Sequence, residues 1–598
     1  MNPKEQYIKD RDRYKKQLEQ LNNQLNFYSN LRLLIIVIGI ILSIWFYSQH
    51  SYLYLFNTLI ITLVVFLGLV AIHHRIHTLE TKTSALYQLN DCGVKHIDGQ
   101  WSQSEENGEE YIDDSHSYSW DLDIFGKHSL FQWINHTNTL MGKEKLRDAL
   151  INPVKSIDVI SKRQKAVIEL ISIMEWVHEF RATGIINKNL KQDYKKLLRW
   201  CKEVNSLYST AVLKFLVRLL PIISLSMLTF AYFTPISYSY GVILIAIQVI
   251  ITIINFRTRH EIVASMSQYR QQIKVYEQMI KSIEKQQFQS LLLKSLQNQM
   301  IYQEKELASM QIKKLDGIMD MLSLRQMQFY VLFNIITIWD YHCVIALENW
   351  KNKYGKHLEK WLDSLGEFEA LISLGTIAYE QSNWVMPTIT KNHEIKAEEI
   401  GHPLINEKDR VCNHITFGES STSLLITGSN MSGKSTFLRT IGINLVLAYA
   451  GGPVCATSFS CPILNIYTSM RVKDDIDNKV SSFYAELLRI KNIIKAIDKG
   501  EKVFYLLDEI FKGTNSRDRH IGAKTLIKKL SNEQTLGLVS THDLELADLA
   551  FEPHSRIKNF HFQEYYKDNK IYFDYKLYKG VSDTFNAVYL MKQIGIEI

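Results

Sequence analysis

A glycine-rich segment in the last third of the chain has the residue types that hold phosphate groups. The apolar run Ser423–Thr427 leads into a segment of the form G-x-x-x-x-G-K-[ST], and a helical pattern follows from Phe437. Strand, glycine loop and helix together form the context in which this pattern binds phosphate. The loop's backbone N–H groups and the positive end of the helix both attract phosphate oxygens. The predicted nucleotide-binding residues are Gly428, Ser429, Asn430, Met431, Ser432, Gly433, Lys434, Ser435 and Thr436.

Two further strand ends supply the side chains that phosphate chemistry needs. The apolar run 503–507 ends in Asp508 and Glu509, and the run 536–540 ends in Thr541 and His542. We expect Ser435 and Asp508 to hold Mg²⁺, and Lys434 to reach the β and γ phosphates. Glu509 is placed to orient the attacking water, and His542 to sense the γ-phosphate. Unrelated polar residues at strand ends are the alternative, but three such ends together favour ATP hydrolysis with Lys434, Glu509 and His542 as catalytic groups.

These segments resemble the MutS family. The phosphate loop is similar to the MutS sequence G-P-N-M-S-G-K-S-T, with Ser429 in place of proline. Asp508–Asn515 resembles D-E-I-G-R-G-T-S, and Ser540–His542 resembles A-T-H. The other similar segments are Asp474–Glu486, Gly401–Pro403 with Asn413, and Phe125–Gln164, which resembles the start of the MutS core domain.

The resemblance implies a two-fold homodimer with composite ATP sites. Ser481 would then face the γ-phosphate held by the other subunit's loop, and His561 would stack on adenine. A helix cap is the alternative for Ser481. For His561 the alternative is an ordinary surface side chain, because Arg410 stands where the family often has an aromatic partner.

Four apolar runs form two pairs. Only Leu53–Ile72 reaches the ~20 residues that cross a bilayer comfortably, and the flanks of the others complete the span. The two connecting loops carry no Lys or Arg, whereas Arg32, Arg75, Arg218, Arg257 and Arg259 flank the pairs. This asymmetry predicts a multi-pass protein of the cytoplasmic membrane, with both termini and the ATPase domain in the cytoplasm. Four buried core helices are the alternative. The runs are Leu33–Tyr47, Leu53–Ile72, Leu219–Phe233 and Tyr240–Phe256.

Composition excludes a disulfide-stabilised scaffold, because the six cysteines are scattered without paired spacing. The net charge of +7 is small for 598 residues and permits either nucleic acid or an anionic lipid surface as a partner.

The predicted fold is mixed, with an α/β P-loop (ABC-like) ATPase domain and an α-helical core and lever region that carries the transmembrane hairpins. Between Arg259 and about Trp350 the chain has no proline and one glycine, which predicts long helices. The expected domains are 1–80 (amino-terminal helix and first hairpin), 81–205 (core), 206–258 (second hairpin), 259–395 (lever helices and rest of the core) and 396–598 (ATPase).

The resemblance implies an ATP-dependent DNA-binding protein of the mismatch repair type. No domain with the family's F-x-E wedge precedes the core, so we expect duplex binding without mismatch selectivity. Two alternatives remain open. One is a membrane-tethered, ATP-driven scaffold for a protein partner. The other is an ABC-like transporter, against which stand the absence of an LSGGQ signature and of charged residues inside the spans.

Overall fold

The computed structural model describes most of the chain, and the described residues form two compact units. The helical unit comprises Met1–Val94, Thr137–Lys143 and Ile173–Glu369, and the head unit comprises Lys95–His136, Glu144–Ser172 and Ala370–Ile598. This mixed, helix-rich architecture with sheets agrees with the predicted fold class. The described residues are 2–186, 193–203, 208, 210–302, 306–419, 421–471, 482–511, 515–567 and 570–581.

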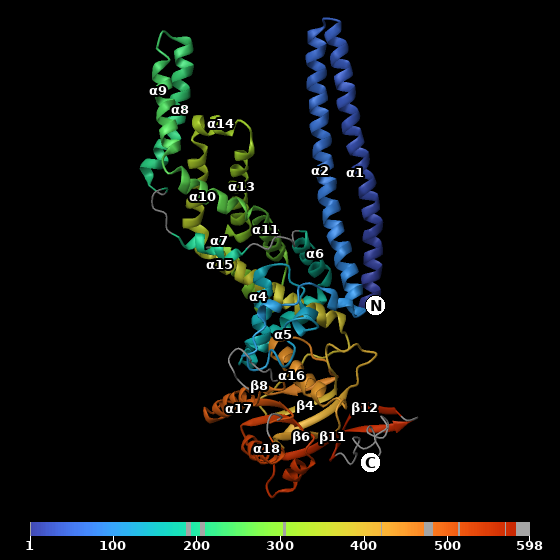
Figure 1. The fold of residues 1–598 in the computed structure, drawn as a ribbon. Helices are drawn as coiled ribbons and strands as arrows, with labels where there is room; N and C mark the ends of the chain where they lie inside the picture. The colour runs from blue at the N-terminus through green and yellow to red at the C-terminus, as the bar shows by residue number, and fades with distance from the viewer. Residues whose placement is uncertain are drawn as a thin grey trace. The chain divides into compact units, whose positions relative to one another are not determined.

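Two long helices form an antiparallel hairpin at the start of the helical unit (Figure 1). Helix α1 spans Pro3–Ser48 and α2 spans Tyr52–Ile97, so each continues well beyond the apolar run that predicted it. The helices approach closely at Gly39, where an added Cβ would lie 2.5 Å from the side chain of Thr62. Along the apolar runs most large hydrophobic side chains are exposed, which is the reverse of a buried core helix.

A second helix pair follows, α8 (Ala211–Phe233) and α9 (Ser239–Ile253). The amide of Gln248 donates to the hydroxyl of Ser224 at 2.8 Å, and both side chains are buried between the helices. The predicted fourth run extended to Phe256, and this end was wrong. Asn255 has a left-handed backbone, with φ 54°, so α9 ends before it and the chain turns by 63° into α10 (Phe256–Ser267).

By length and composition, three helices of the described residues could cross a membrane: α1, α2 and α8. The number rises to five if each of two bent pairs counts as one span. One pair is α9 with α10, and the other is α14 (Tyr330–Thr337) with α15 (Trp339–Glu380).

The prediction of long helices from Arg259 to Trp350 was wrong for most of this region. The described chain there is cut into helices of 8–16 residues before α15 begins at Trp339. Polar caps cause some of the breaks: the Ser290 side chain, for example, accepts from the backbone N–H of Leu293 and starts a new helix. The remaining helices of the helical unit are α6 (Met174–Ile185), α7 (Tyr194–Lys202), α11 (Arg270–Lys285), α12 (Leu291–Asn298) and α13 (Ala308–Leu322), with the strand pair β1 (Ile301–Tyr302) and β2 (Glu306–Leu307).

The head unit is built on a six-stranded sheet in the order β12-β11-β6-β10-β9-β8, parallel except for β12. Side chains alternate between its faces. Val503, Tyr505 and Leu507 pack with α17 and α18 in one apolar core, whereas Leu506 faces Gly442 of α16. The elements are β6 (Ser423–Thr427), α16 (Lys434–Ala450), β8 (Asn465–Ser469), α17 (Ser482–Asp498), β9 (Val503–Asp508), α18 (Ser516–Leu530), β10 (Thr535–Ser540), β11 (Ile557–Lys567) and β12 (Lys570–Lys579).

A smaller sheet in the order β3-β7-β4-β5 completes the head, together with three helices from earlier in the chain. The smaller elements are β3 (Thr388–Ile389), β4 (Glu394–Ile400), β5 (Asn413–Gly418), β7 (Ser458–Cys461), α3 (Leu130–Ile134), α4 (Leu140–Ile151), which crosses from one unit to the other, and α5 (Ile157–Ser172). The expected five-domain boundaries stay a prediction.

A buried carboxyl in the helical unit makes stability depend on pH. Glu369 of α15 accepts the backbone N–H of Asn138 at 2.7 Å and the hydroxyl of Thr139. Burial raises its pKa from 4.5 to about 7. Because the folded pKa is the higher one, the protonated form stabilises the fold. That stabilisation is complete below about pH 4.5 and is lost as the pH rises through 7.

We therefore expect Glu369→Gln, which is neutral throughout, to flatten this dependence. The difference in free energy of unfolding between the variant and the wild type should change by up to about 3 kcal/mol between pH 5 and pH 8. Thermal unfolding in detergent measures it, with the exposed Glu359→Gln on the same helix as control. Parallel pH profiles for wild type and Glu369→Gln would contradict the assignment.

Candidate functional site

Parallel pairing brings three strand ends to one edge of the large sheet. Ser540 of β10 pairs with Ile426 of β6 on one side and with Asp508 of β9 on the other. The residues that follow these positions therefore emerge together, as at the carboxyl edge of other open α/β sheets. The glycine loop, Glu509 and His542 meet there, as the sequence predicted.

The glycine loop curls because its backbone enters the left-handed region. Gly428, Met431 and Gly433 have φ of 145°, 69° and 103°. A Cβ at Gly428 would lie 2.9 Å from the Ser432 hydroxyl oxygen, so only glycine fits there without a shift. Gly433 caps α16, whose first residue is Lys434. The loop thus ends on a helix amino terminus, where backbone N–H groups have no partner within the helix.

Lys434 lies beneath this loop. Its side-chain nitrogen donates to the carbonyl oxygens of Gly428 at 2.9 Å and Ser429 at 2.8 Å, and the residue is 4% exposed. A buried ammonium needs such acceptors, because burial without them is costly. Lys434, the residue predicted to bind phosphate, is therefore oriented and held by the loop itself.

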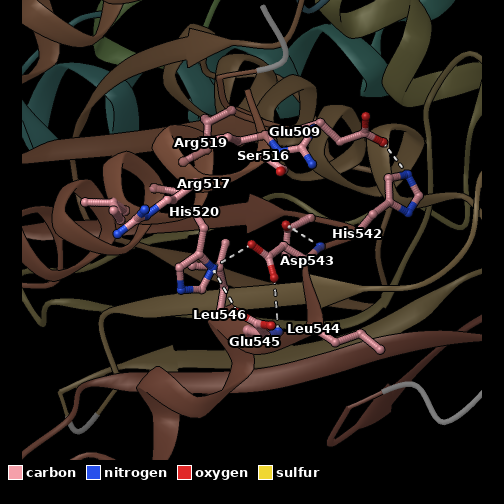
Figure 2. Close-up of a pocket in the computed structure, with 14 residues that line it drawn as sticks. Glu509, Ser516, Arg517, Arg519, His520, His542, Asp543, Leu544, Glu545 and Leu546 are labelled. Atoms are coloured by element: carbon pink, nitrogen blue, oxygen red, sulfur yellow. Dashed lines mark hydrogen bonds and ion pairs between the residues drawn. The ribbon is translucent and has the colours of Figure 1, made fainter. Parts of the chain in front are cut away.

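His542 joins the loop to the acidic strand end. Its Nε2 lies 2.5 Å from Oε1 of Glu509, 2.7 Å from Oδ1 of Asn430 and 3.4 Å from Nζ of Lys434. The two nearer atoms are both acceptors, so Nε2 carries a proton that it can donate to them. Figure 2 shows the Glu509 carboxylate and the His542 ring turned toward each other. The imidazole therefore bonds to Glu509 and lies next to Lys434, so the three predicted catalytic groups are neighbours.

Asp508 and Ser435 supply oxygen atoms of the type that Mg²⁺ prefers. Asp508 ends β9 and accepts a hydrogen bond from the Ser540 hydroxyl, which fixes its carboxylate. Ser435 follows Lys434 and lines the cavity beside the loop. The donor set fits a hard divalent cation, and these two residues would hold it.

A cavity of about 400 Å³ lies beside the loop, within the size range of ligand pockets. Its polar end consists of the loop residues and Glu509. His402 lines it as a neutral ring, because burial lowers its pKa to about 4. Apolar and aromatic side chains make up part of the rest of the lining, together with Asp409, Asn413 and Thr440. The apolar and aromatic lining residues are Ile400, Ile405, Val411, Phe437, Phe562 and Tyr575.

The structure places His561 outside this cavity and Tyr575 inside it. His561 pairs with Thr427 across the sheet, but its ring lies near Tyr578 and the Gly580 carbonyl. Its neighbour Phe562 faces the cavity, because successive side chains of a strand point to opposite faces. Tyr575 of β12 has φ 56°, and its ring would lie 3.1 Å from a Cβ at Gly433. Sequence reasoning missed Tyr575, since β12 carries several aromatic residues and none stands out from the others.

Ser429, where the MutS loop has proline, makes a contact that proline could not make. Its hydroxyl donates to the carboxylate of Glu564, which is 3% exposed on β11. This bond ties the tip of the loop to the strand that borders β6. The departure from the family pattern therefore replaces a rigid ring with a hydrogen bond.

A second tether holds the chain after β9. Glu486 of α17 is buried, and its carboxylate accepts the backbone N–H of Phe511 at 2.6 Å. Glu509 and Phe511 both have positive φ, 51° and 64°, so this segment needs such support. Ser481, predicted to face a second subunit, lies outside the described residues.

A larger cavity of about 780 Å³ (Figure 2) shares Glu509 with the first, and His542 lines the larger one. The start of α18 and the segment after His542 line the rest. There His520 pairs with Asp543 at 2.8 Å. Glu509 therefore lies between two open spaces, one of them beside the phosphate loop.

Comparison with known proteins gives matches along most of the chain. Residues 114–499 match the model of MutS domain III, and residues 424–596 match that of MutS domain V. The DNA mismatch repair protein MutS of Streptococcus mutans serotype c is 28% identical over 263 residues, which are 43% of this chain and 30% of that protein. The protein of the same name from Listeria monocytogenes serotype 4a is 30% identical over 243 residues, 40% of this chain and 28% of the relative. The protein of that name from Methanosarcina mazei is 26% identical over 271 residues, which are 43% of this chain and 29% of the relative.

The fold and the site therefore define a class of protein. Its members have an α/β head with a glycine loop at the carboxyl edge of a parallel sheet, and this head is joined to a helical unit. The domain III match alone covers more than half of the chain. The chain belongs to the MutS family. The matched regions span less than a third of the length of these MutS relatives.

We expect Tyr575→Ala to weaken ATP and ADP binding about tenfold, because stacking on an aromatic ring contributes ~1–3 kcal/mol per base. His561→Ala should leave both affinities unchanged. Titration with a fluorescent adenine nucleotide measures this, and the triphosphate tail alone serves as a ligand without a base. The opposite order of the two variants would restore His561 as the stacking residue.

Proposed function

We propose that this protein is a membrane-anchored ATPase of the MutS family that binds duplex DNA at the cytoplasmic face. The observation that carries the proposal is the meeting of Lys434, Glu509 and His542 beside the glycine loop. Family membership supports the same activity. The glycine loop, which has the form that holds a phosphate chain, and the aromatic residues that line the adjoining cavity support ATP as the nucleotide.

Each group has a role that follows from its position. When ATP binds, the Lys434 ammonium gives up its hydrogen bonds to the loop carbonyls and bonds to the β and γ phosphate oxygens. These oxygens are charged and therefore bind the ammonium more strongly. Glu509 orients the attacking water, and His542 keeps that carboxylate aligned with the loop through Asn430. Mg²⁺ held by Ser435 and Asp508 would neutralise charge on the phosphates. The loop N–H groups stabilise charge that develops during transfer.

The distribution of apolar surface supports membrane anchoring. On α1 and α2 the large hydrophobic side chains of the apolar runs are mostly exposed; Leu33, for example, is 65% exposed and Leu53 71%. Water-exposed apolar patches of this extent are rare on soluble proteins. The backbone of a helix satisfies its own polar groups, as lipid requires. Arg32 and Arg75 flank the hairpin while its loop has no Lys or Arg, which favours a cytoplasmic head.

The family relationship also supports two partners, DNA and a second copy of this chain. The relatives are named DNA mismatch repair proteins, and the matched region includes the core and the head. We infer a homodimer in which Ser481 of each copy completes the other copy's ATP site. Contacts to DNA would come from lysine and arginine on the phosphate backbone, and such contacts carry no base information.

Two substitutions separate nucleotide binding from hydrolysis. Lys434→Ala should abolish tight ATP binding, because the loop then lacks its phosphate-binding charge. Glu509→Gln should bind ATP normally and hydrolyse it about 10²–10⁴-fold more slowly, because the amide cannot act as a base toward water. Filter binding and single-turnover hydrolysis distinguish the two. Lys524→Ala, a surface lysine of the head, is the matched control. Normal turnover by Glu509→Gln would exclude the water-orienting role.

DNA binding should be weak, steeply salt-dependent and equal for matched and mismatched duplexes. Affinity should fall by orders of magnitude as salt rises through the physiological range, because each phosphate contact releases a counterion. Fluorescence anisotropy of detergent-solubilised protein, with ADP and with a non-hydrolysable ATP analogue, measures both properties. A clear preference for mismatches would contradict the proposed lack of selectivity. Absence of binding with either nucleotide would favour the ATP-driven scaffold instead.

A further inference from the structure

An uncharged segment after the second helix pair was assigned from sequence to the lever helices. From Gln326 to Trp339 no residue is charged, and most are large and apolar. Such a stretch is shorter than the ~20 residues of a membrane span. At this length the physical choices are a buried core helix, or a segment that enters only one side of a membrane.

Burial excludes the core helix for this segment. Phe329 is 75% exposed, Val331 69% and Leu332 59%, and Phe333 and Ile336 are also exposed. These side chains lie on or next to α14, which is bent by 70° from α15 and runs crosswise to α13 in Figure 1. The outer face of α14 is thus an apolar surface without a charged side chain.

A polar cluster on the inner side fixes which face of α14 points outward. The carboxylate of Asp340, which is 2% exposed, pairs with Arg325 at 2.8 Å and accepts from the hydroxyl of Tyr330. The Asn334 side chain accepts the backbone N–H of Asp340 at 2.9 Å. Because Tyr330 and Asn334 of α14 both bond to Asp340, the helix cannot turn its apolar side chains inward without breaking these hydrogen bonds.

The neighbouring end of α9 is built for a nonaqueous environment. Arg259, one of the basic residues that flank the apolar runs, is 0% exposed and donates to the carbonyl oxygens of Thr252 and Ile254. The hydroxyl of Tyr341 donates to Ile251 at 3.1 Å and Ile254 at 3.0 Å. The last carbonyls of α9 therefore have protein partners in place of water, as a helix end at membrane depth requires.

We propose that Phe329 and α14 form a membrane-embedded interfacial element, with its apolar face in the acyl region of one leaflet beside α9. This inference rests on the proposed membrane anchoring. We assign lipid as the partner of the apolar face of α14. Helix α14 packs against α9, and the outer face of α9 is also apolar, so the two helices form one continuous apolar surface. Tyr330 and Trp339 at the two ends of α14 suit the headgroup level. In addition to the two helix pairs, the protein thus contacts the membrane at a third and shallower place, next to the second pair.

Site-directed spin labelling of the full-length protein in liposomes tests the inference. The background is Cys92→Ser, because the other five cysteines are buried or half-buried. Single cysteines replace Leu332 on α14, Ile60 on α2 and Phe551, a 79% exposed side chain of the head. Collision rates with oxygen, which concentrates in lipid, and with a water-soluble nickel chelate report the environment of each label.

We expect labels at positions 332 and 60 to collide preferentially with oxygen, with 332 at the shallower depth, and the label at 551 to collide with nickel. If the label at position 332 collides with nickel while the label at position 60 prefers oxygen, the interfacial element is wrong and the membrane anchoring stands. Nickel accessibility at 60 would overturn both. Shielding of 332 from both agents, with spin–spin broadening, would assign the α14 face to a second copy and also overturn the inference.

Discussion

Parallel hydrogen bonding among β6, β10 and β9 is the constraint on which the rest of the head depends. The register aligns Ile426, Ser540 and Asp508 in one row, so the next residues of all three strands leave the sheet at one level. A one-residue slip would send these side chains to the opposite face. The pairing therefore does more than hold the core together, because it brings a cation, a carboxylate and an imidazole within a few ångströms of one another.

Sequence alone predicted the part of the site that is contiguous in the chain. The glycine loop, its strand and its helix form one local unit, and Asp508 and His542 each follow an apolar strand directly. Tyr575 could not be predicted in this way. Its place depends on the antiparallel return of β12 and on a positive φ, and neither leaves a local signal. For the same reason the sequence located the apolar run of α9 but misplaced its end, which a left-handed Asn255 decides.

Polar groups buried next to apolar surface have a common function in the helical unit. Gln248 and Ser224 join α8 to α9, and Arg259 closes the free carbonyls at the end of α9. In each case a polar side chain satisfies another polar group where water would be excluded. Sequence placed Arg259 among the basic residues that flank the second pair of runs, but it does not show the direction of the side chain, which is buried. The combination of an apolar exterior and a satisfied polar interior is what membrane insertion requires.

Alkaline carbonate extraction of membranes that contain the full-length protein tests the central claim most directly, that a MutS-type ATP-binding head is anchored in lipid. The pelleted membranes are resealed and assayed for ATP binding, with the Lys434→Ala protein as the background. The account predicts that the chain stays in the pellet and that the pellet binds ATP in a Lys434-dependent manner. Release of the chain to the supernatant would contradict the anchoring and leave a soluble MutS-family protein with unusually exposed apolar helices.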